Sequence, residues 1–280
     1  MRTSNKSITL NLPSIESQAS CFAIIGSGPM LVHAFGQKSF TEMLEKMVGC
    51  RQDGTPLDSE REPKDLEREF VDAHAFNERG DEVIPCRWIK AGMLTAVAAS
   101  RKQLNASAMK RAVRVTGFTS PILHPKTKRA AKAELQHDVV RVGSWSNRTP
   151  DVRARPRYDE WMIEIVVKVI TDQTPMEHVA WALSAMGELV GLGDWRTEKN
   201  GEYGFFKVKG LPASETDRIM AACSSPERKL TIPPALMTAM KTKGITQAQV
   251  LAEMERVKGG TKNGTKSKGR QNGAQANGTP

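Results

Sequence analysis

Arginine side chains gather near the middle of the chain. Arg153, Arg155 and Arg157 alternate, so in an extended segment their three guanidinium groups would lie on one side of the backbone. A guanidinium is always charged and can hold a phosphate through two hydrogen bonds, so this spacing suits successive phosphates of one nucleic-acid strand. Trp145 and Arg148 precede them and add an aromatic ring and a fourth guanidinium. A solvated loop without a ligand is the alternative interpretation.

A second group of candidate residues surrounds the dipeptide Asn200-Gly201. Asn-Gly favours a hairpin turn because both turn positions need a positive φ, which predicts strands over 194–199 and 202–208. On the second strand, Tyr203 and Phe205 would share one face and Phe206 the other. One face is expected to pack in the core, whereas the other could stack bases while neighbouring cations hold the backbone. The aromatic residues and cations concerned are Trp195, Arg196, Lys199, Tyr203, Phe205, Phe206 and Lys207.

Further cations lie in a predicted loop over 125–133, namely Lys126, Lys128, Arg129 and Lys132. They belong to a larger basic segment. Residues 101–157 hold 14 lysines and arginines against 3 carboxylates, a net charge of +11, whereas the whole chain has a net charge of +10. This concentration favours a directed polyanion-binding face. The acidic segment 51–82 offers an alternative, because it could pair with the basic segment of a neighbouring copy.

Residue types that carry out catalysis or hold metals show no recognised spacing. The four cysteines form no CxxC pair and the five histidines no HExxH or HxH pair, so we expect no metal site. The turn Gly26-Ser27-Gly28-Pro29 lacks the Lys-Ser/Thr of a phosphate loop, and its proline removes an amide donor. We therefore expect no cofactor and no enzymatic activity. A catalytic site assembled from distant residues is a weaker alternative.

The chain shows no segment typical of secretion or membrane insertion. Its first six residues are not followed by the apolar run of a signal peptide, and no apolar stretch approaches the about 20 residues of a membrane helix. The separated cysteines are expected to be reduced and mostly buried thiols. These features predict a cytoplasmic protein that does not contact membranes.

The elements that must position the candidate residues alternate between strands and helices, which predicts an α+β fold. A strand over 158–170 is rich in β-branched and aromatic residues. The next helix begins with a capping box, formed by Thr174 and Glu177 around Pro175. Other predicted strands cover 7–12, 21–25, 113–118 and 139–142; other predicted helices cover 39–48, 213–223, 233–243 and 246–257, and one starts at Arg87. Residues 144–156 are predicted to be a loop.

The predicted organisation has three parts. An α+β core covers 1–225, and a short helical extension covers 226–258. The remaining segment, 259–280, has no carboxylates and several lysines, glycines and threonines. Such a composition cannot bury enough apolar surface to fold, so this segment is predicted to be a disordered basic tail.

Three segments, taken in this order, resemble a known group of proteins. They are GSGPML at 26–31, VIPCRWIKAGML at 83–94, and GLGDWR followed by GEYGFFKV over 191–208. The pattern resembles the RAMP superfamily, the RNA-binding backbone subunits of CRISPR effector complexes. It is still closer to uncharacterised phage and prophage proteins. The resemblance implies a ferredoxin-like or RRM-like antiparallel sheet with helices on one face, single-stranded nucleic-acid binding and oligomerisation along the strand. No endonuclease signature accompanies it.

The function that these patterns favour is non-enzymatic binding of single-stranded DNA or RNA by a phage-encoded homo-oligomer. Phosphates would contact the basic segment, and bases would stack near the Asn200-Gly201 turn. The alternative is a protein-interaction or assembly factor. Such a factor would use its basic surface and the helices over 233–257 to bind an acidic protein.

Overall fold

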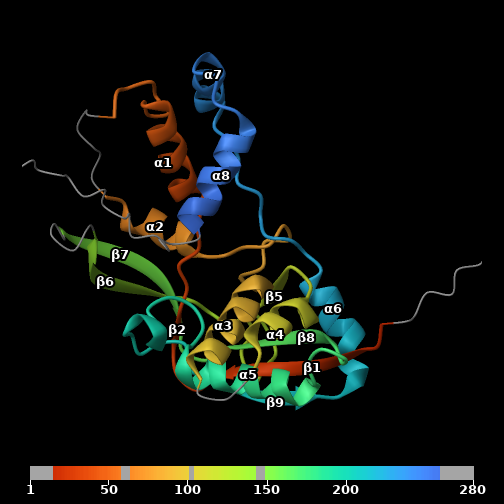
Figure 1. The fold of residues 1–280 in the computed structure, drawn as a ribbon. Helices are drawn as coiled ribbons and strands as arrows, with labels where there is room; N and C mark the ends of the chain where they lie inside the picture. Colours follow the sequence, from red (N-terminus) through yellow and green to blue (C-terminus); the bar gives the residue numbers. More distant parts are fainter. Residues whose placement is uncertain (1–14, 58–63, 101–103, 143–148, 259–280) are drawn as a thin grey trace, which may run out of the picture. The chain divides into compact units, whose positions relative to one another are not determined.

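The computed structural model describes residues 15–57, 64–100, 104–142 and 149–258 (Figure 1). Nine β-strands, eight α-helices and two short 3-10 helices form within these ranges. In chain order they are β1 (Ser17–Gly26), β2 (Met30–Leu31), α1 (Gln37–Val48), α2 (Leu66–Ala73), β3 (Val83–Pro85), α3 (Cys86–Ala99), α4 (Ala106–Ala112), β4 (Val113–Thr116), β5 (Thr119–Pro121), β6 (Glu134–Val142), β7 (Thr149–Tyr158), β8 (Met162–Ile170), α5 (Met176–Leu189), η1 (Thr197–Lys199), β9 (Phe206–Leu211), η2 (Ala213–Glu215), α6 (Thr216–Cys223), α7 (Pro234–Thr242) and α8 (Gln247–Lys258).

The main sheet has the strand order β4-β8-β1-β9, and every neighbouring pair is antiparallel. The two central strands, β1 and β8, contain the segments with the strongest strand patterns in the sequence. Successive side chains on a strand point to opposite faces, so the sheet presents two faces of different character. The expected α+β fold with an antiparallel sheet is confirmed.

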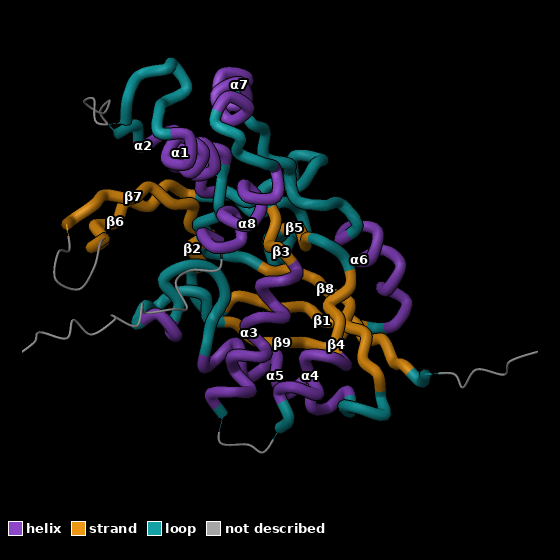
Figure 2. Tube along the Cα trace, turned by 45° about the horizontal axis from the view of Figure 1, so that its top comes forward, coloured by secondary structure: helices purple, strands orange, loops and turns teal. Residues whose placement is uncertain are grey.

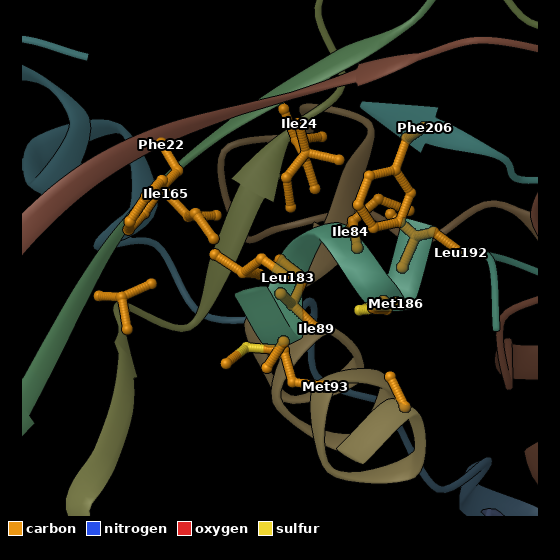
Figure 3. Close-up of a cluster of buried hydrophobic side chains, with 14 of the residues drawn as sticks. Phe22, Ile24, Ile84, Ile89, Met93, Ile165, Leu183, Met186, Leu192 and Phe206 are labelled. Atoms are coloured by element: carbon orange, nitrogen blue, oxygen red, sulfur yellow. The ribbon is translucent and has the colours of Figure 1, made fainter. Parts of the chain in front are cut away.

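One face of the main sheet carries the hydrophobic core. Ile24 of β1 and Ile165 of β8 point from the sheet toward Leu183 of α5 and Ile89 of α3, and all four side chains are buried (Figure 3). Figure 2 shows α3, α4 and α5 together on this side of the strands. Helices α3 and α5 come close at Gly92, where an added Cβ would meet the flexible end of the Met186 side chain in α5. Helices α3, α4 and α5 thus cover this face as expected, whereas α6 packs on the other face.

The second face of the main sheet is covered only in part. Helix α6 packs there through Ile219 and Cys223, which contact Cys21 of β1 and Val166 of β8. Next to this cluster, edge strand β9 presents exposed lysines at positions 207 and 209. This face is therefore apolar beneath α6 and basic along β9.

A second sheet has the strand order β2-β7-β6. Strand β7 overlaps residues 144–156, so the prediction of a loop there is wrong over 149–156. Two prolines and three arginines in this segment resemble a solvated loop, yet β6 pairs with β7 over nine residues, from Glu134↔Arg157 to Val142↔Thr149. Helix α2 packs against β7. A third, two-stranded sheet pairs β3 with β5.

The chain divides into two compact units. The first comprises residues 1–38 and 61–231, and the second comprises residues 39–60 and 232–280. Helices α7 and α8 lie close to the predicted helices over 233–243 and 246–257, and α1 belongs to the same unit as they do. The predicted strand over 7–12 and the predicted tail over 259–280 lie outside the described residues. No helix among the described residues is both long and apolar enough to span a membrane.

Candidate nucleic-acid interface

The loop between α5 and β9 contains three glycines whose backbone adopts a positive φ. Gly191, Gly193 and Gly204 adopt φ values of 75°, 92° and 78°, a region that residues with a Cβ avoid. The loop is fixed to neighbouring backbone: the Asp194 amide donates to the Leu31 carbonyl over 2.7 Å, and the Gly204 amide donates to Pro29 over 2.8 Å. Backbone hydrogen bonds therefore hold the loop after α5 in one conformation against the segment 29–31.

The predicted hairpin around Asn200-Gly201 is wrong in its first strand. Residues 197–199 form the 3-10 helix η1, and strand β9 begins only at Phe206. Asn200 does take the left-handed conformation that the dipeptide predicts, with φ 58° and ψ 32°. It ends η1 instead of joining two strands, because the glycines at 191 and 193 have already turned the chain. Phe206 is buried in the core, and Phe205 is half-buried.

Two aromatic rings stack within this loop. The rings of Trp195 and Tyr203 lie 6.2 Å apart at their centroids with an interplanar angle of 22°. Trp195 is 36% exposed and has a φ of 46°, which is rare for a bulky residue. Gly201 makes room for this arrangement, since a Cβ there would overlap the Trp195 carbonyl. We call Trp195 and Tyr203 the aromatic platform.

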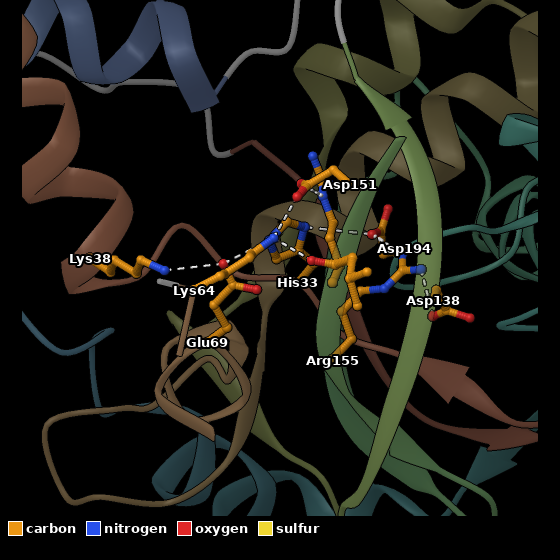
Figure 4. Close-up of polar contacts among 10 residues, drawn as sticks. His33, Lys38, Lys64, Glu69, Asp138, Asp151, Arg155 and Asp194 are labelled. Carbon is orange, nitrogen blue, oxygen red and sulfur yellow. Dashed lines mark hydrogen bonds and ion pairs between the residues drawn. The ribbon is translucent and has the colours of Figure 1, made fainter. Parts of the chain in front are cut away.

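A buried arginine supports the aromatic platform. Arg155 of β7 donates to Asp138 and to Asp194, each over 2.6 Å, and its guanidinium carbon lies 5.3 Å from the centre of the Trp195 ring. Figure 4 shows Arg155 between the two carboxylates. Arg153, Arg155 and Arg157 alternate along β7, but the prediction that all three guanidinium groups are presented to a ligand is wrong, because Arg155 is only 2% exposed. Its charge is matched by carboxylates and is not presented to solvent.

Asp194 joins Arg155 to a histidine. The Nδ1 atom of His33 lies 3.6 Å from an Asp194 carboxylate oxygen (Figure 4). Burial would raise the pKa of Asp194, but hydrogen bonds with His33 and Arg155 outweigh it and hold this pKa well below its usual range. Asp194 is therefore a carboxylate at neutral pH. Among the described residues, the Nε atom of Arg155 has no hydrogen-bond partner.

The two cations next to the platform, Arg196 and Lys199, differ in how closely a carboxylate holds them. The guanidinium of Arg196 is held by Glu198 over 2.6 Å and donates to the Gly193 carbonyl over 3.0 Å. Lys199 is exposed, and its ammonium lies 3.8 Å from Glu198. Arg196, Lys199 and Tyr203 are close to Trp195 in the sequence as well as in the loop. Arg155 comes from β7, 40 residues earlier, and only the fold brings it to the Trp195 ring.

A further set of predicted cations lies on the second face of the main sheet. The ammonium of Lys128 contacts the Met162 sulfur over 3.1 Å and Glu164 over 3.3 Å. In the strand register Met162 pairs with Ile25, and Ile25 pairs with Lys207. Two strand spacings, about 10 Å, therefore separate Met162 from Lys207 on this face. Two cations that no local sequence pattern singled out lie here as well. Lys209 alternates with Lys207 on β9, and Arg218 of α6 donates to Glu164 over 2.8 Å.

The remaining predicted residues are dispersed. Lys126 lies 3.4 Å from Glu160, and Arg129 and Lys132 are exposed in the same loop. Arg157 donates to Asp159 over 2.7 Å, and Arg153 lies 3.7 Å from Asp151. Trp145 and Arg148 lie outside the described residues.

Comparison with known proteins finds no matching family model and no matching curated protein. Among solved structures, the chain is similar to one described as the cryo-EM structure of the type III-B Cmr-beta bound to cognate target RNA, with 10% identity, a TM-score of 0.42 and 70% of this chain covered. It spans about three-fifths of that chain, 61%. It is also similar to Cmr6 from Pyrococcus furiosus, with 9% identity, a TM-score of 0.33, and coverage of 71% of this chain and 100% of Cmr6.

Proposed function

We propose that this protein is a non-enzymatic single-stranded nucleic-acid-binding protein whose aromatic platform stacks against bases. The observation that carries the proposal is the stacked pair of Trp195 and Tyr203 on a glycine-fixed loop. A positive φ at a tryptophan costs about 1–3 kcal/mol and persists only where surrounding contacts enforce it. Such local strain gathers at ligand sites. Here the strain holds an indole ring that is 36% exposed beside an exposed lysine, Lys199.

Stacking on this platform favours single strands over duplexes. A base inside a duplex is already stacked on its neighbours, whereas an unpaired base offers both faces of its ring to aromatic side chains. Every base has such a face, so stacking of this kind tolerates many sequences. The proposal is therefore a binder with low sequence preference.

Phosphate contacts in this proposal come from the exposed cations. Lys199 lies next to the platform, and Lys207 and Lys209 continue from it along β9. Lys207 and Lys209 are exposed. None of the ion pairs found among the described residues includes either lysine, so a phosphate would not have to displace a partner. Arg155 has a different role: it positions the loop through Asp138 and Asp194.

The test is a titration of fluorescein-labelled dT30 and U30 with the purified full chain, followed by anisotropy at low salt. Loss of one stacked base costs about 1–3 kcal/mol, so Trp195→Ala should weaken binding about 5- to 150-fold. Trp195→Phe should retain most of the affinity, since a ring remains. Phe118→Ala is the matched control, because Phe118 is an exposed aromatic residue on a different turn.

The same titration checks the finer parts of the proposal. Comparison of dT30 with U30 measures DNA against RNA, and a duplex competitor measures the preference for single strands. The mass of complexes on dT60 measures whether several copies bind along one strand. Failure of the wild-type protein to bind either oligonucleotide, or equal binding by Trp195→Ala and wild type, would reject the proposal.

A further inference from the structure

Strand β6 forms a free edge of the second sheet. Within the described ranges β7 is the only strand that pairs with it, and Figure 1 shows the two strands side by side as a ribbon. The outer side of an edge strand carries N–H and C=O groups that another strand can use. Strand β6 pairs with β7 over nine residues without a bulge, and its sequence, ELQHDVVRV, contains no proline and no lysine. Three features that commonly prevent edge-to-edge pairing are therefore missing from β6.

One face of β6 exposes apolar side chains along this edge. Leu135 and Val139 are 44% and 67% exposed, and His137 lies between them on the same face. Val152 of β7, which is directly opposite Val139, is 39% exposed. Removal of such apolar surface from water is favourable. The face of β6 that holds Leu135 and Val139 would therefore be stabilised by a neighbouring strand.

Antiparallel pairing of β6 with a second β6 is self-complementary in one register. In a symmetric antiparallel pair, directly opposed residues share a face and the residue on the two-fold axis lies opposite its own copy. With His137 on the axis, Leu135 of each copy lies opposite Val139 of the other. Gln136 then lies opposite Asp138. Apolar residues thus oppose apolar residues, and an amide donor opposes a carboxylate.

Neighbouring registers are less favourable. With Asp138 on the axis, the two Asp138 carboxylates oppose each other, and with Gln136 on the axis, Glu134 opposes Asp138. Like charges in directly opposed positions destabilise a sheet. With Val139 on the axis, Leu135 no longer lies opposite a valine. The sequence of β6 therefore favours the register centred on His137.

We propose that β6 pairs with β6 of a second copy of this chain, antiparallel and with His137 on the two-fold axis. The pairing joins two second sheets through their edges in the strand order β7-β6-β6-β7. This inference goes beyond the proposed function and does not depend on it, because it concerns the protein without nucleic acid. Contact between two single strands is small for a protein interface, so the dimer should be weak and form at about 10–100 μM.

The proposed dimer places both aromatic platforms on the same side. In the register of β6 and β7, Arg155 shares a face with Asp138, and its guanidinium carbon lies 5.3 Å from the centre of the Trp195 ring. A two-fold axis perpendicular to the joined sheet keeps each face on its own side. The two β7 strands would lie three strand spacings apart, about 14 Å. The dimer would thus present two platforms to one strand of nucleic acid, a consequence that alone rests on the proposed function.

The first experiment measures the mass of the nuclease-treated full chain by sedimentation at about 0.5 M salt, which screens ionic association. The wild-type mass should rise with concentration from one chain of 30.8 kDa toward two. Val139→Lys should raise the dissociation constant at least about tenfold, because each dimer loses two Leu135–Val139 pairs and must accommodate two ammonium groups. Val152→Lys is the matched control. It places the same charge on the same face but on β7, away from the edge, and should leave the dissociation constant unchanged.

The second experiment tests the register by disulfide cross-linking in a Cys50→Ser background, since the other three cysteines are buried. Oxidation with copper phenanthroline should link His137→Cys to its own copy, because directly opposed residues have Cβ atoms about 5 Å apart. Val140→Cys should not be linked. In the proposed register position 140 lies six residues from its own copy along the strand, about 20 Å.

Several results would overturn this inference. One is a wild-type mass of a single chain up to about 200 μM, well above the range expected for the dimer. Equal weakening by Val139→Lys and Val152→Lys would overturn pairing through the edge, and equal cross-linking of His137→Cys and Val140→Cys would overturn the register. A monomer whose β6 amides resist hydrogen exchange would show that another part of the chain covers the edge. None of these results decides the proposed function, which depends on dT30 binding by wild type and Trp195→Ala.

Discussion

The Arg155 guanidinium is surrounded by groups that match its charge. Asp138 comes from β6 and Asp194 from the loop after α5, so a single side chain joins the second sheet to the loop that carries the aromatic platform. A buried charge without its partners is costly, whereas a buried charge with good hydrogen bonds can be retained. We infer that Arg155 acts by positioning Trp195 and not by contact with a ligand.

Replacement of Arg155 by alanine should strongly destabilise the protein. The change leaves the Asp138 carboxylate buried without its partner, which typically costs about 3–5 kcal/mol. Urea unfolding followed by circular dichroism measures this loss. Arg157→Ala is the control in the same strand, since its ion pair with Asp159 lies at the surface and such pairs contribute under about 1 kcal/mol. Similar losses for both variants would contradict the assigned role of Arg155.

The Asp194 carboxylate should make part of the stability depend on pH. Its pKa in the folded protein is held below the unfolded value of about 3.9. A group of this kind contributes stability that is complete above about pH 5 and is lost as the pH falls through the folded-state pKa. The difference in unfolding free energy between wild type and Asp194→Asn should therefore shrink between about pH 5 and pH 2. Asp159→Asn, at an exposed ion pair, should give a small difference throughout.

At the scale of elements, the loop after α5 depends on glycine at positions where no other residue fits. Gly204 combines a φ of 78° with a Cβ position that would overlap the Leu192 carbonyl. The Leu192 amide in turn donates to the Gly204 carbonyl over 2.9 Å. This pair of contacts closes the loop around Trp195 and Tyr203. The shape of the platform is therefore a property of the loop backbone.

Gly204→Ala should lower stability by more than about 1 kcal/mol, because alanine at a positive φ is strained and has no space here. It should also weaken dT30 binding, because the platform loses its backbone support. Gly210→Ala is the matched control in β9: nothing lies within 4 Å of its Cβ position, so the change should be neutral or stabilise by up to about 1 kcal/mol. Chemical unfolding and anisotropy check both expectations. Unchanged dT30 binding by Gly204→Ala would contradict the claim that the platform depends on Gly204 for its backbone support.

At the scale of the whole molecule, the two compact units differ in the size of their cores. The first unit holds the main sheet with a large buried cluster, whereas the second holds few buried apolar residues, among them Leu44 of α1, Leu236 of α7 and Val250 of α8. Regions with fewer buried contacts open more readily. We therefore expect amide hydrogens of α1, α7 and α8 to exchange faster than those of β1 and β8.

Val250→Asp should accelerate amide exchange in α1, although Val250 and α1 are about 200 residues apart in sequence. The reason is that a charge buried in the second unit destabilises that whole unit. Exchange in β8 should stay unchanged. Val257→Asp, at an exposed position of the same helix, should have no effect on α1. Hydrogen exchange followed by mass spectrometry measures all three, and identical α1 exchange in both variants would contradict the grouping of α1 with α8.

Local patterns in the sequence predicted much of the fold. The alternation in 158–170, the helix predicted after Thr174 and the apolar run over 21–25 correspond to β8, α5 and the centre of β1. The predicted capping box is wrong, because α5 begins at Met176 after Pro175 and has no side-chain cap. These elements could be predicted because the signal lies in neighbouring residues. Strand β7 could not, because its prolines and arginines favour a loop and only pairing with β6 makes it a strand.

Three features could be predicted from residues close together along the chain: the antiparallel α+β core, the concentration of positive charge in the middle of the chain, and the mixture of aromatic residues and cations near Asn200-Gly201. Which of these cations are exposed and free of a carboxylate partner depends on the folded arrangement. It buries Arg155 between two carboxylates from distant segments, leaves Lys207 exposed, and places Arg114 opposite Lys168. The reason is physical: the state of a charge depends on its neighbours in space, and strand register and loop closure bring together residues that spacing along the chain does not relate.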